Sequence, residues 1–311
     1  MGNQNEYRSI KLIISFVAML FLASCGGGGG GGGTTPTANP TPATPVDTSE
    51  DFSNKTDEEL RSLASEVYTA SELVSLTSMF NGLGAAFQPV TENCTADADG
   101  GTLDILIPPG TTGTGTLTFA NCDLGGIVVN GSIVLKSPSS LANFSSDLAF
   151  NNLNMAVSEE SLSITINGTT YYFTSSNGLS GRISTNGGSI TYGITSPDLT
   201  GSITVNDFDM TYSKNSSTGV LSTEFNYSLS STGIGAGGDI AVTTTSPILH
   251  RDDIDSYPFA GSFEITGKNG ATIRVTISGD GTSTGGNVTV EIDKDGTAGF
   301  ETTTVMTWDE F

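Results

Sequence analysis

The single histidine of the chain limits the enzymatic chemistry that can be assigned to it. His250 lies in the sequence LHRDD, which we expect to be a charged connection between two strands. A Ser–His–acid triad would have to use this residue, and segment 281–285 (GTSTG) does match the G-x-S-x-G pattern of nucleophile elbows. That segment is typical of a polar turn between strands, whereas an elbow joins a strand to a helix. We therefore predict a surface histidine and no catalytic triad.

Two other catalytic patterns are also incomplete. Segment 233–238 (GIGAGG) matches the G-x-G-x-x-G fingerprint, but a strand-like sequence follows it where dinucleotide binding needs a helix. With one His and no free Cys, since one cysteine is the expected anchor and the other two are an expected disulfide, the chain also lacks the ligand sets of zinc and transition-metal sites. A catalytic pair of carboxylates, as in glycosidases, is left as an alternative, because two such acids can be far apart in sequence. We expect no catalytic residue.

Calcium is the metal that this composition permits. Segment 291–296 (EIDKDG) is similar to the first half of a calcium loop, with Asp293 and Asp295 as the ligand candidates. The first position departs from the pattern, and Glu301 falls one place short of the bidentate twelfth position. An Asp-Gly turn without a metal is the alternative. The sequence therefore offers one calcium-binding turn as a hypothesis.

The first cysteine belongs to an export signal. Arg8 and Lys11 precede a 12-residue apolar run, residues 12–23, which is too short to span a bilayer. The run ends in Leu-Ala-Ser-Cys25, which resembles the lipobox of bacterial lipoproteins. That resemblance implies cleavage after residue 24, lipidation of Cys25 and anchoring in a lipid bilayer. The alternative is an ordinary secretory signal.

A spacer follows the predicted anchor. Residues 26–33 are eight glycines, and a Thr/Pro-rich segment continues to Glu50. Polyglycine is a flexible coil and Thr/Pro segments lean toward polyproline II, so the tether reaches about 30–60 Å. Gly26 is not the Asp that retains lipoproteins in the inner membrane of enterobacteria. The resemblance therefore implies the outer membrane, on a side that the sequence does not define.

Cys94 and Cys122 remain as an even pair in an exported chain. We predict a disulfide between them, with two reduced buried thiols as the alternative. It would close a loop of about 29 residues, and chain entropy makes such a closure worth about 3–4 kcal/mol.

The composition excludes several classes of protein. The 311 residues include 40 Gly, only 14% charged residues, and 33 Asp plus Glu against 11 Lys plus Arg, a net charge of −22. Removal of residues 1–24 leaves 9 basic and 32 acidic side chains, a net charge of −23. A surface this acidic repels phosphates, which argues against nucleic-acid binding. The Gly-, Ser- and Thr-rich sequence also argues against a coiled coil or helical bundle.

The body begins with a helical segment. From Thr56 to Phe87 the apolar residues recur at spacings of three and four, and Thr56 with Glu59 has the spacing of a capping box. Packing against the sheet is the expected role of this segment, and recruitment of a partner is the alternative. The predicted apolar stripe comprises Leu60, Leu63, Ala64, Val67 and Tyr68.

Beyond Gln88 the period changes to two. In segment 220–229 one face carries Phe225, Tyr227 and Leu229, and similar alternation recurs to the C-terminus. Two Asn-Gly dipeptides, at Asn167–Gly168 and Asn269–Gly270, predict type I′ hairpin turns. We expect about 12–15 strands in a mainly β fold. This fold is an antiparallel β-meander (large open sheet, sandwich or barrel-like) behind the short helical segment and the disordered tether.

The expected organisation has four parts. Residues 1–24 are the signal peptide, 25–50 the lipidated cysteine and linker, 51–87 the helical segment and 88–311 the β domain. Within the last part, the pattern G-S-Φ-x-Φ starts at Gly131, Gly201 and Gly261, at intervals too irregular for a solenoid.

Short motifs in the β domain resemble a group of β-rich lipoproteins of Gram-negative bacteria. They are FANC at 119–122, VNGSI at 129–133, YPFAGSF at 257–263, DKDG at 293–296 and Trp308. The resemblance extends over about residues 90–311 and implies no activity.

Three functions follow as hypotheses. The first is an outer-membrane lipoprotein whose β domain is a non-catalytic structural or ligand-binding module for an envelope or extracellular ligand. The second is a hydrolase that acts on polysaccharide through paired carboxylates. The third is a transmembrane barrel, suggested by the strand count and by the terminal Phe311, although the residues that share its face are not the apolar series of a barrel signal.

Overall fold

The computed structural model describes thirteen stretches of the chain. They are residues 48–77, 90–93, 102–106, 114–123, 127–136, 144–157, 162–174, 179–195, 200–232, 238–251, 257–282, 285–297 and 299–311. The predicted signal peptide, Cys25 and most of the linker lie outside these residues, as do Cys94 and residues 78–89, the last part of the predicted helical segment.

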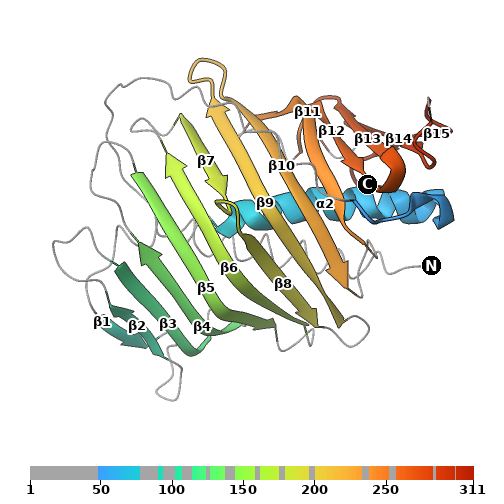
Figure 1. Ribbon diagram of the computed structural model, residues 1–311. Coiled ribbons are helices and arrows are strands. Elements are labelled where there is room, and N and C mark those ends of the chain that lie inside the picture. Colours follow the sequence, from blue (N-terminus) through green and yellow to red (C-terminus); the bar gives the residue numbers. More distant parts are fainter. Residues whose placement is uncertain are drawn as a thin grey trace.

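The described residues form one helix of 21 residues, two short 3-10 turns and one antiparallel sheet of 15 strands (Figure 1). The prediction of a mainly β meander behind a helical segment is confirmed. The helical elements are η1 (Phe52–Asn54), α2 (Asp57–Thr77) and η2 (Lys268–Gly270). The strands are β1 (Val90–Asn93), β2 (Thr102–Leu106), β3 (Thr114–Asp123), β4 (Ile127–Lys136), β5 (Phe144–Val157), β6 (Leu162–Thr174), β7 (Ser180–Ser184), β8 (Ser189–Thr195), β9 (Thr200–Lys214), β10 (Val220–Thr232), β11 (Ile240–Arg251), β12 (Ala260–Thr266), β13 (Thr272–Ser278), β14 (Asn287–Asp293) and β15 (Thr302–Thr307).

Strand order follows chain order, and β1 and β15 are the two ends of the sheet. Of the three forms that the sequence left open, the described strands therefore adopt the open sheet. One position departs from a simple meander, because β7 and β8 together occupy a single place between β6 and β9. The tight turn Thr185–Gly188 separates them, closed by a hydrogen bond from the Gly188 N–H to the Thr185 carbonyl. The terminal Phe311 follows β15 in a turn rather than in a strand.

The start of α2 was predicted correctly. The Thr56 hydroxyl accepts a hydrogen bond from the Glu59 N–H, and the Glu59 carboxylate accepts bonds from the Thr56 N–H and hydroxyl. This reciprocal capping box satisfies backbone donors that the first turn leaves unpaired. The predicted stripe is the buried face of the helix: Leu60, Leu63, Ala64 and Val67 are at most 2% exposed, and Tyr68 packs against the same core.

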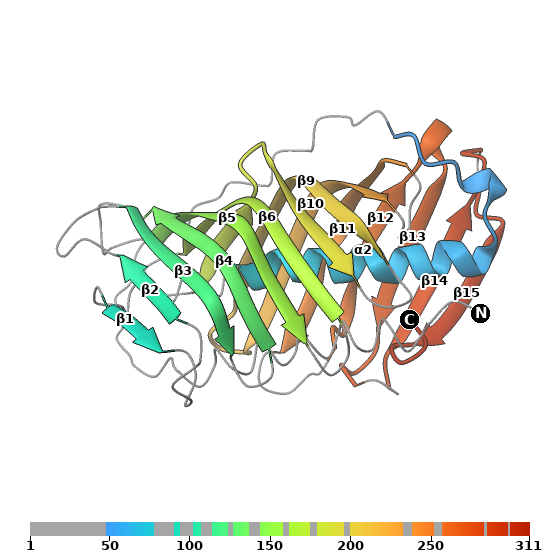
Figure 2. The same ribbon diagram turned by 90° about the horizontal axis from the view of Figure 1, so that it is seen from below.

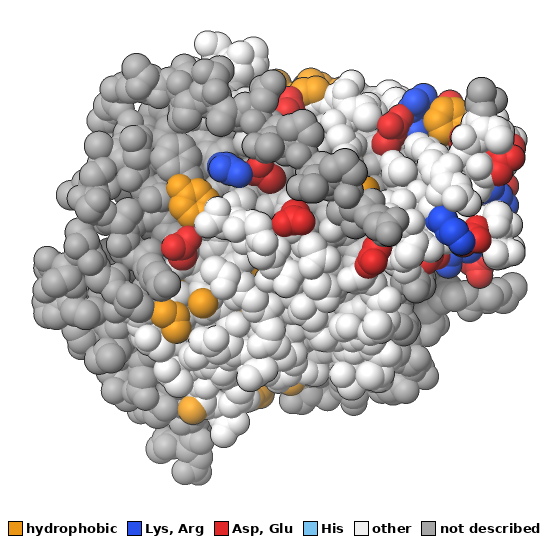
Figure 3. Space-filling view, in the orientation of Figure 1, with side chains coloured by type: hydrophobic (Ala, Val, Ile, Leu, Met, Phe, Trp, Pro, Cys, Tyr) orange, Lys and Arg blue, Asp and Glu red, His pale blue; other side chains and the backbone are white. Residues whose placement is uncertain are grey.

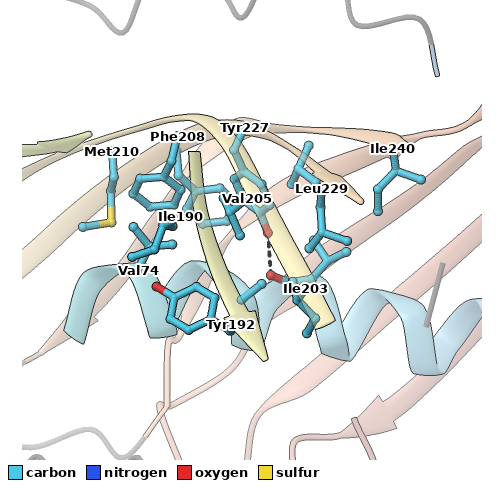
Figure 4. Close-up of a cluster of buried hydrophobic side chains, with 14 of the residues drawn as sticks. Val74, Ile190, Tyr192, Ile203, Val205, Phe208, Met210, Tyr227, Leu229 and Ile240 are labelled. Carbon is cyan, nitrogen blue, oxygen red and sulfur yellow. Dashed lines mark hydrogen bonds between the residues drawn. The ribbon is translucent and has the colours of Figure 1, made fainter. Parts of the chain in front are cut away.

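The helix crosses the inner face of the sheet. Asp57 accepts a hydrogen bond from Thr302 of β15, the Val67 carbonyl accepts one from Tyr227 of β10, and Val74 lies beside Tyr192 of β8 (Figure 4). A helix of 21 residues is about 31 Å long, close to the roughly 34 Å of the seven strand spacings from β15 to β8. The helix therefore covers the sheet from β15 to β8, and the expected packing against the sheet is confirmed.

Bulges bend the sheet around the helix. Figure 2, seen from below, shows β5 and β6 passing in front of one end of α2 and β13 and β14 passing behind the other. Asn121, Asn152 and Asp207 have left-handed backbone angles at interruptions of β3, β5 and β9. A bulge adds a residue to one strand and increases the local twist, so a series of them coils a sheet.

The hairpin predicted at Asn167–Gly168 is wrong. Both residues lie inside β6, where the Asn167 side chain accepts a hydrogen bond from the N–H of the bulged Asn152 on β5. Gly168 has φ +130°, and a Cβ there would lie 2.4 Å from the Ser189 carbonyl oxygen. The dipeptide therefore accommodates a bulge beside it instead of reversing the chain. The second dipeptide, Asn269–Gly270, does form the predicted turn between β12 and β13.

Candidate functional site

One of the three cysteines is among the residues that the structure describes. Cys122 is fully buried in β3, whereas Cys25 and Cys94 lie outside the described residues. Asn93, the neighbour of Cys94, pairs with Thr102 of β2, which in turn pairs with Ala120 of β3. The register therefore brings the chain next to Cys94 to the same end of β3 as Cys122. The disulfide stays a prediction.

The predicted calcium turn follows β14. Carboxylate oxygens of Asp293, Asp295 and Glu301 lie within 4.8 Å of one another, so the structure adds Glu301 to the pair chosen from sequence. Asp293 is 8% exposed, and its Oδ1 accepts hydrogen bonds from the N–H groups of Asp295 and Gly296. Oxygen ligands of this kind suit a hard cation.

The same oxygens also hold the turn together. Hydrogen bonds from the hydroxyl and the N–H of Thr297 lower the pKa of Asp295, and the Glu301 carboxylate accepts a bond from the Lys294 N–H. Such bonds stabilise an Asp-Gly turn with or without a metal. The calcium hypothesis therefore stays a prediction with three named ligands.

The residues of the rejected catalytic motifs are only partly described. His250 lies in β11, opposite Leu221 of β10, and not in the charged connection that its sequence predicted. Strand β11 extends further than expected because it pairs with β10 as far as Arg251. Of the G-x-S-x-G segment, Gly281 and Thr282 lie in a turn after β13, and Ser283 is outside the described residues. Most of the G-x-G-x-x-G segment is also outside them.

A row of polar side chains crosses the outer face of the sheet, opposite α2. The strand register places Asp147, Tyr171, Ser184, Asp209 and Asn226 directly opposite one another on β5, β6, β7, β9 and β10. Directly paired residues share one face of a sheet, and their buried neighbours along each strand point to the helix. We call these five residues the polar row.

An ion pair orients the middle of the polar row. Arg182 donates from Nε to Asp209 Oδ1 at 2.6 Å and from a terminal nitrogen to Oδ2 at 3.0 Å. These hydrogen bonds raise the pKa of Arg182, against the effect of its partial burial. A bidentate guanidinium–carboxylate pair of this kind is planar and geometrically specific.

Several members of the polar row are buried although they face outward. Ser184 is 1% exposed, and Asp209 and Asn226 are each 8% exposed. The Ser184 hydroxyl has no hydrogen-bond partner within the described part of the chain. A buried hydroxyl without a partner costs free energy, so this position carries an unmet capacity for hydrogen bonding.

A field of hydroxyl and amide groups adjoins the polar row on the same face. Asn154 donates to the hydroxyls of Ser163 and Thr165, Thr191 bonds to Thr204, and Ser202 bonds to Thr232. We call these seven residues the hydroxyl field. Figure 3 views this face, where most of the described atoms are white, the colour of backbone and of side chains that are neither charged nor hydrophobic.

Sequence reasoning missed the polar row because its members are 13 to 25 residues apart and no local motif joins them. The sequence does show Asp and Arg at polar, outward positions of its alternating segments. Which of these residues stand opposite one another depends on the strand register, which the sequence does not give. The structure also places Glu224 of β10 opposite Thr211, diagonal to Asp209. Diagonal neighbours lie about 7–8 Å apart, so these two acids are the pair that most resembles glycosidase carboxylates.

Comparisons with known proteins add no family to this description: no family model, curated protein or solved structure matches the chain. Among the described residues, α2 is too polar to be a membrane-spanning helix, and no other helix is long enough.

Proposed function

We propose that the chain is a lipid-anchored protein of the bacterial outer membrane whose β domain binds a ligand and does not catalyse a reaction. The lipobox at Cys25 and the Gly- and Thr/Pro-rich spacer support the anchor. The anchored lipid would hold the domain at the membrane, and the spacer would give it reach.

The observation that carries this proposal is the junction between spacer and sheet. The N–H groups of Ser49 and Glu50 donate to the Asp239 carbonyl, and the Thr48 hydroxyl donates to the Gly267 carbonyl at 2.7 Å. The Lys268 N–H donates back to the Glu50 carbonyl. The end of the spacer is therefore hydrogen-bonded to the residue before β11 and to the two residues after β12, which fixes it to this part of the sheet.

Two glycines make room for this junction. A Cβ on Gly238 would lie 2.8 Å from the Glu50 nitrogen, and one on Gly267 would lie 2.7 Å from the Glu50 oxygen. Both distances are shorter than real side chains adopt, so the backbone approach needs glycine at each position. A firm attachment at this end suits a domain displayed on a tether.

The arrangement of the two faces favours binding over catalysis. The apolar inner face is packed against α2, and the outer face presents ordered polar groups. Both oxygens of Asp209 already accept bonds from Arg182, which occupies one member of the carboxylate pair. A hydrolase that uses Asp209 and Glu224 is the second candidate function, favoured by their diagonal placement.

The anchor is tested by acyl labelling of the full chain in a bacterial host. Cys25→Ala should abolish incorporation of labelled palmitate and move the protein out of the membrane fraction, because only the thiol can form the thioether. Ser24→Ala, which keeps a small residue in the lipobox, is the control and should label normally. Labelling that persists in Cys25→Ala would contradict the proposal.

A further inference from the structure

We propose that the polar row and the hydroxyl field bind a neutral glycan, laid across strands β5 to β10 on the outer face. This inference rests on the proposed function of a displayed binding domain and names the chemistry of its ligand. The argument uses the charge, the spacing and the hydrogen-bonding capacity of these side chains.

The hydroxyl field is uncharged, and the central carboxylate of the polar row is paired, on a strongly acidic protein. Arg182 pairs with Asp209, and the seven residues of the hydroxyl field include no charged side chain. The outward positions of β8 are Ser189, Thr191, Gly193 and Thr195, none of them charged. A net charge of −22 repels polyanions, and the hydroxyl field has no carboxylate to attract a polycation. An uncharged ligand fits this surface best.

The groups present are those that recognise sugar hydroxyls. Tyr171 is partly exposed and offers a ring with a polar edge, and Asp147 beside it offers carboxylate acceptors. Serine and threonine hydroxyls both donate and accept hydrogen bonds, as sugar hydroxyls do. Cross-strand bonds such as Thr191 to Thr204, at 3.1 Å, hold these hydroxyls in place before a ligand arrives. Less conformational freedom is then lost on binding.

The spacing of the face suits an extended chain. Neighbouring strands are about 4.8 Å apart, so a ligand that crosses them meets a polar side chain at each step. The hydroxyl field provides such steps, because the register aligns the accessible residues Asn154, Thr165, Ser202 and Thr232 across β5, β6, β9 and β10. In the adjoining polar row, the unpaired Ser184 hydroxyl is buried at the centre. Its missing partner is the observation in this row that points most directly to a ligand.

The test uses the full, lipid-anchored chain purified in detergent. Affinity electrophoresis and calorimetry would measure binding to a panel of neutral glucans, mannans and galactans, with alginate as polyanion and chitosan as polycation. We expect binding to at least one neutral glycan and none to alginate or chitosan. Absence of binding to every neutral glycan, or a preference for a charged one, would overturn the inference.

Variants then locate the site. Tyr171→Ala and Thr191→Ala should each weaken binding, the first by about tenfold because an aromatic contact is lost, and Tyr171→Phe should retain most of the affinity. Thr276→Ala is the matched control, an outward threonine of β13 opposite Thr289 and far from the row in strand order. Equal affinity in all four variants would also overturn the inference.

If the β domain is an enzyme, and the proposed non-catalytic function is therefore wrong, the same experiments give a different result from loss of glycan binding. Release of reducing ends from the bound glycan, lost in Glu224→Gln while binding persists, would make the protein a hydrolase and leave the glycan site standing. Loss of the glycan result alone would leave the anchored, non-catalytic domain standing, because acyl labelling of Cys25 does not depend on it.

Discussion

The phenol of Tyr227 donates a hydrogen bond to the backbone carbonyl of Val67, and so joins the centre of the sheet to the centre of the helix. Tyr227 is fully buried on β10, and Val67 is fully buried on α2. Figure 4 shows this bond as a dashed line among apolar side chains. Tyr192, also fully buried in this cluster, has a hydroxyl without a partner within the described residues.

The two tyrosines predict opposite responses to the same change. Tyr227→Phe should lower the free energy of unfolding by about 1 kcal/mol, because a buried hydrogen bond is lost. Tyr192→Phe should leave it unchanged or raise it by up to about 1–2 kcal/mol, because an unpaired buried hydroxyl is removed. Urea unfolding followed by the fluorescence of Trp308 measures both. An equal decrease in the free energy of unfolding in both variants would show that the hydrogen bond to Val67 gives the Tyr227 hydroxyl no advantage over the unpaired hydroxyl of Tyr192.

The junction with the spacer predicts a steric effect at one glycine. Gly267→Ala should destabilise the fold by about 1–3 kcal/mol, because the added methyl group would displace Glu50 or Phe52. Gly193→Ala is the control, since a Cβ there would have its nearest neighbour at 3.8 Å, an ordinary contact. Thermal unfolding compares them. A melting temperature that falls equally in both variants would argue against a tight junction.

The first turn of α2 predicts a pH dependence. Hydrogen bonds from Lys294 and Thr302 lower the pKa of Asp57 below its usual 3.8. A lowered pKa in the folded state stabilises the protein above the unfolded-state value, and this stabilisation is lost as the pH falls below about 4.

Asp57→Asn should therefore reduce stability at pH 7 by less than about 1 kcal/mol, because the side chain is 36% exposed. The difference from the wild type should vanish as the pH is lowered to about 2. Glu58→Gln, an exposed acid in the same turn, controls for the helix dipole. Denaturant midpoints measured from pH 7 to 2 test this, and a difference that grows on acidification would contradict it.

The cysteine pair predicts a covalent link. Peptide mapping of the envelope-matured protein without reductant should find Cys94 and Cys122 in one cross-linked pair. Reduction should then lower the free energy of unfolding by about 3–4 kcal/mol, because the unfolded chain regains the entropy of the opened loop. Two thiols that alkylate in the native, unreduced protein would refute the link.

The acidic turn after β14 predicts stabilisation by calcium. Millimolar Ca²⁺ should raise the melting temperature, because a ligand that binds the folded state alone stabilises it. Asp295→Asn combined with Glu301→Gln should remove this rise, since both changes delete carboxylate charge while keeping an acceptor oxygen. Asp280→Asn, in the acidic turn after β13, is the control. A rise of equal size in all three proteins would place the ion elsewhere.

Features that depend on neighbours along the chain were determined by the sequence itself. The start of α2 follows from Thr56 and Glu59, which bond to each other within one turn. The turn at Asn269–Gly270 and the alternation that buries Phe225 were likewise predicted, because both depend on short-range backbone preferences and on a two-residue period.

Only the tertiary structure decided the features that depend on distant partners. Asn167–Gly168 has the sequence of a hairpin turn, yet β6 continues through it. There the Asn167 side chain accepts a hydrogen bond from the N–H of the bulged Asn152 on β5. The polar row exists because the register sets Ser184 opposite Asp209, and a shift by one residue would turn every member to the other face. Local preferences differ by about 1 kcal/mol, whereas pairing along a whole strand sums many contacts, so the long-range pairing prevails.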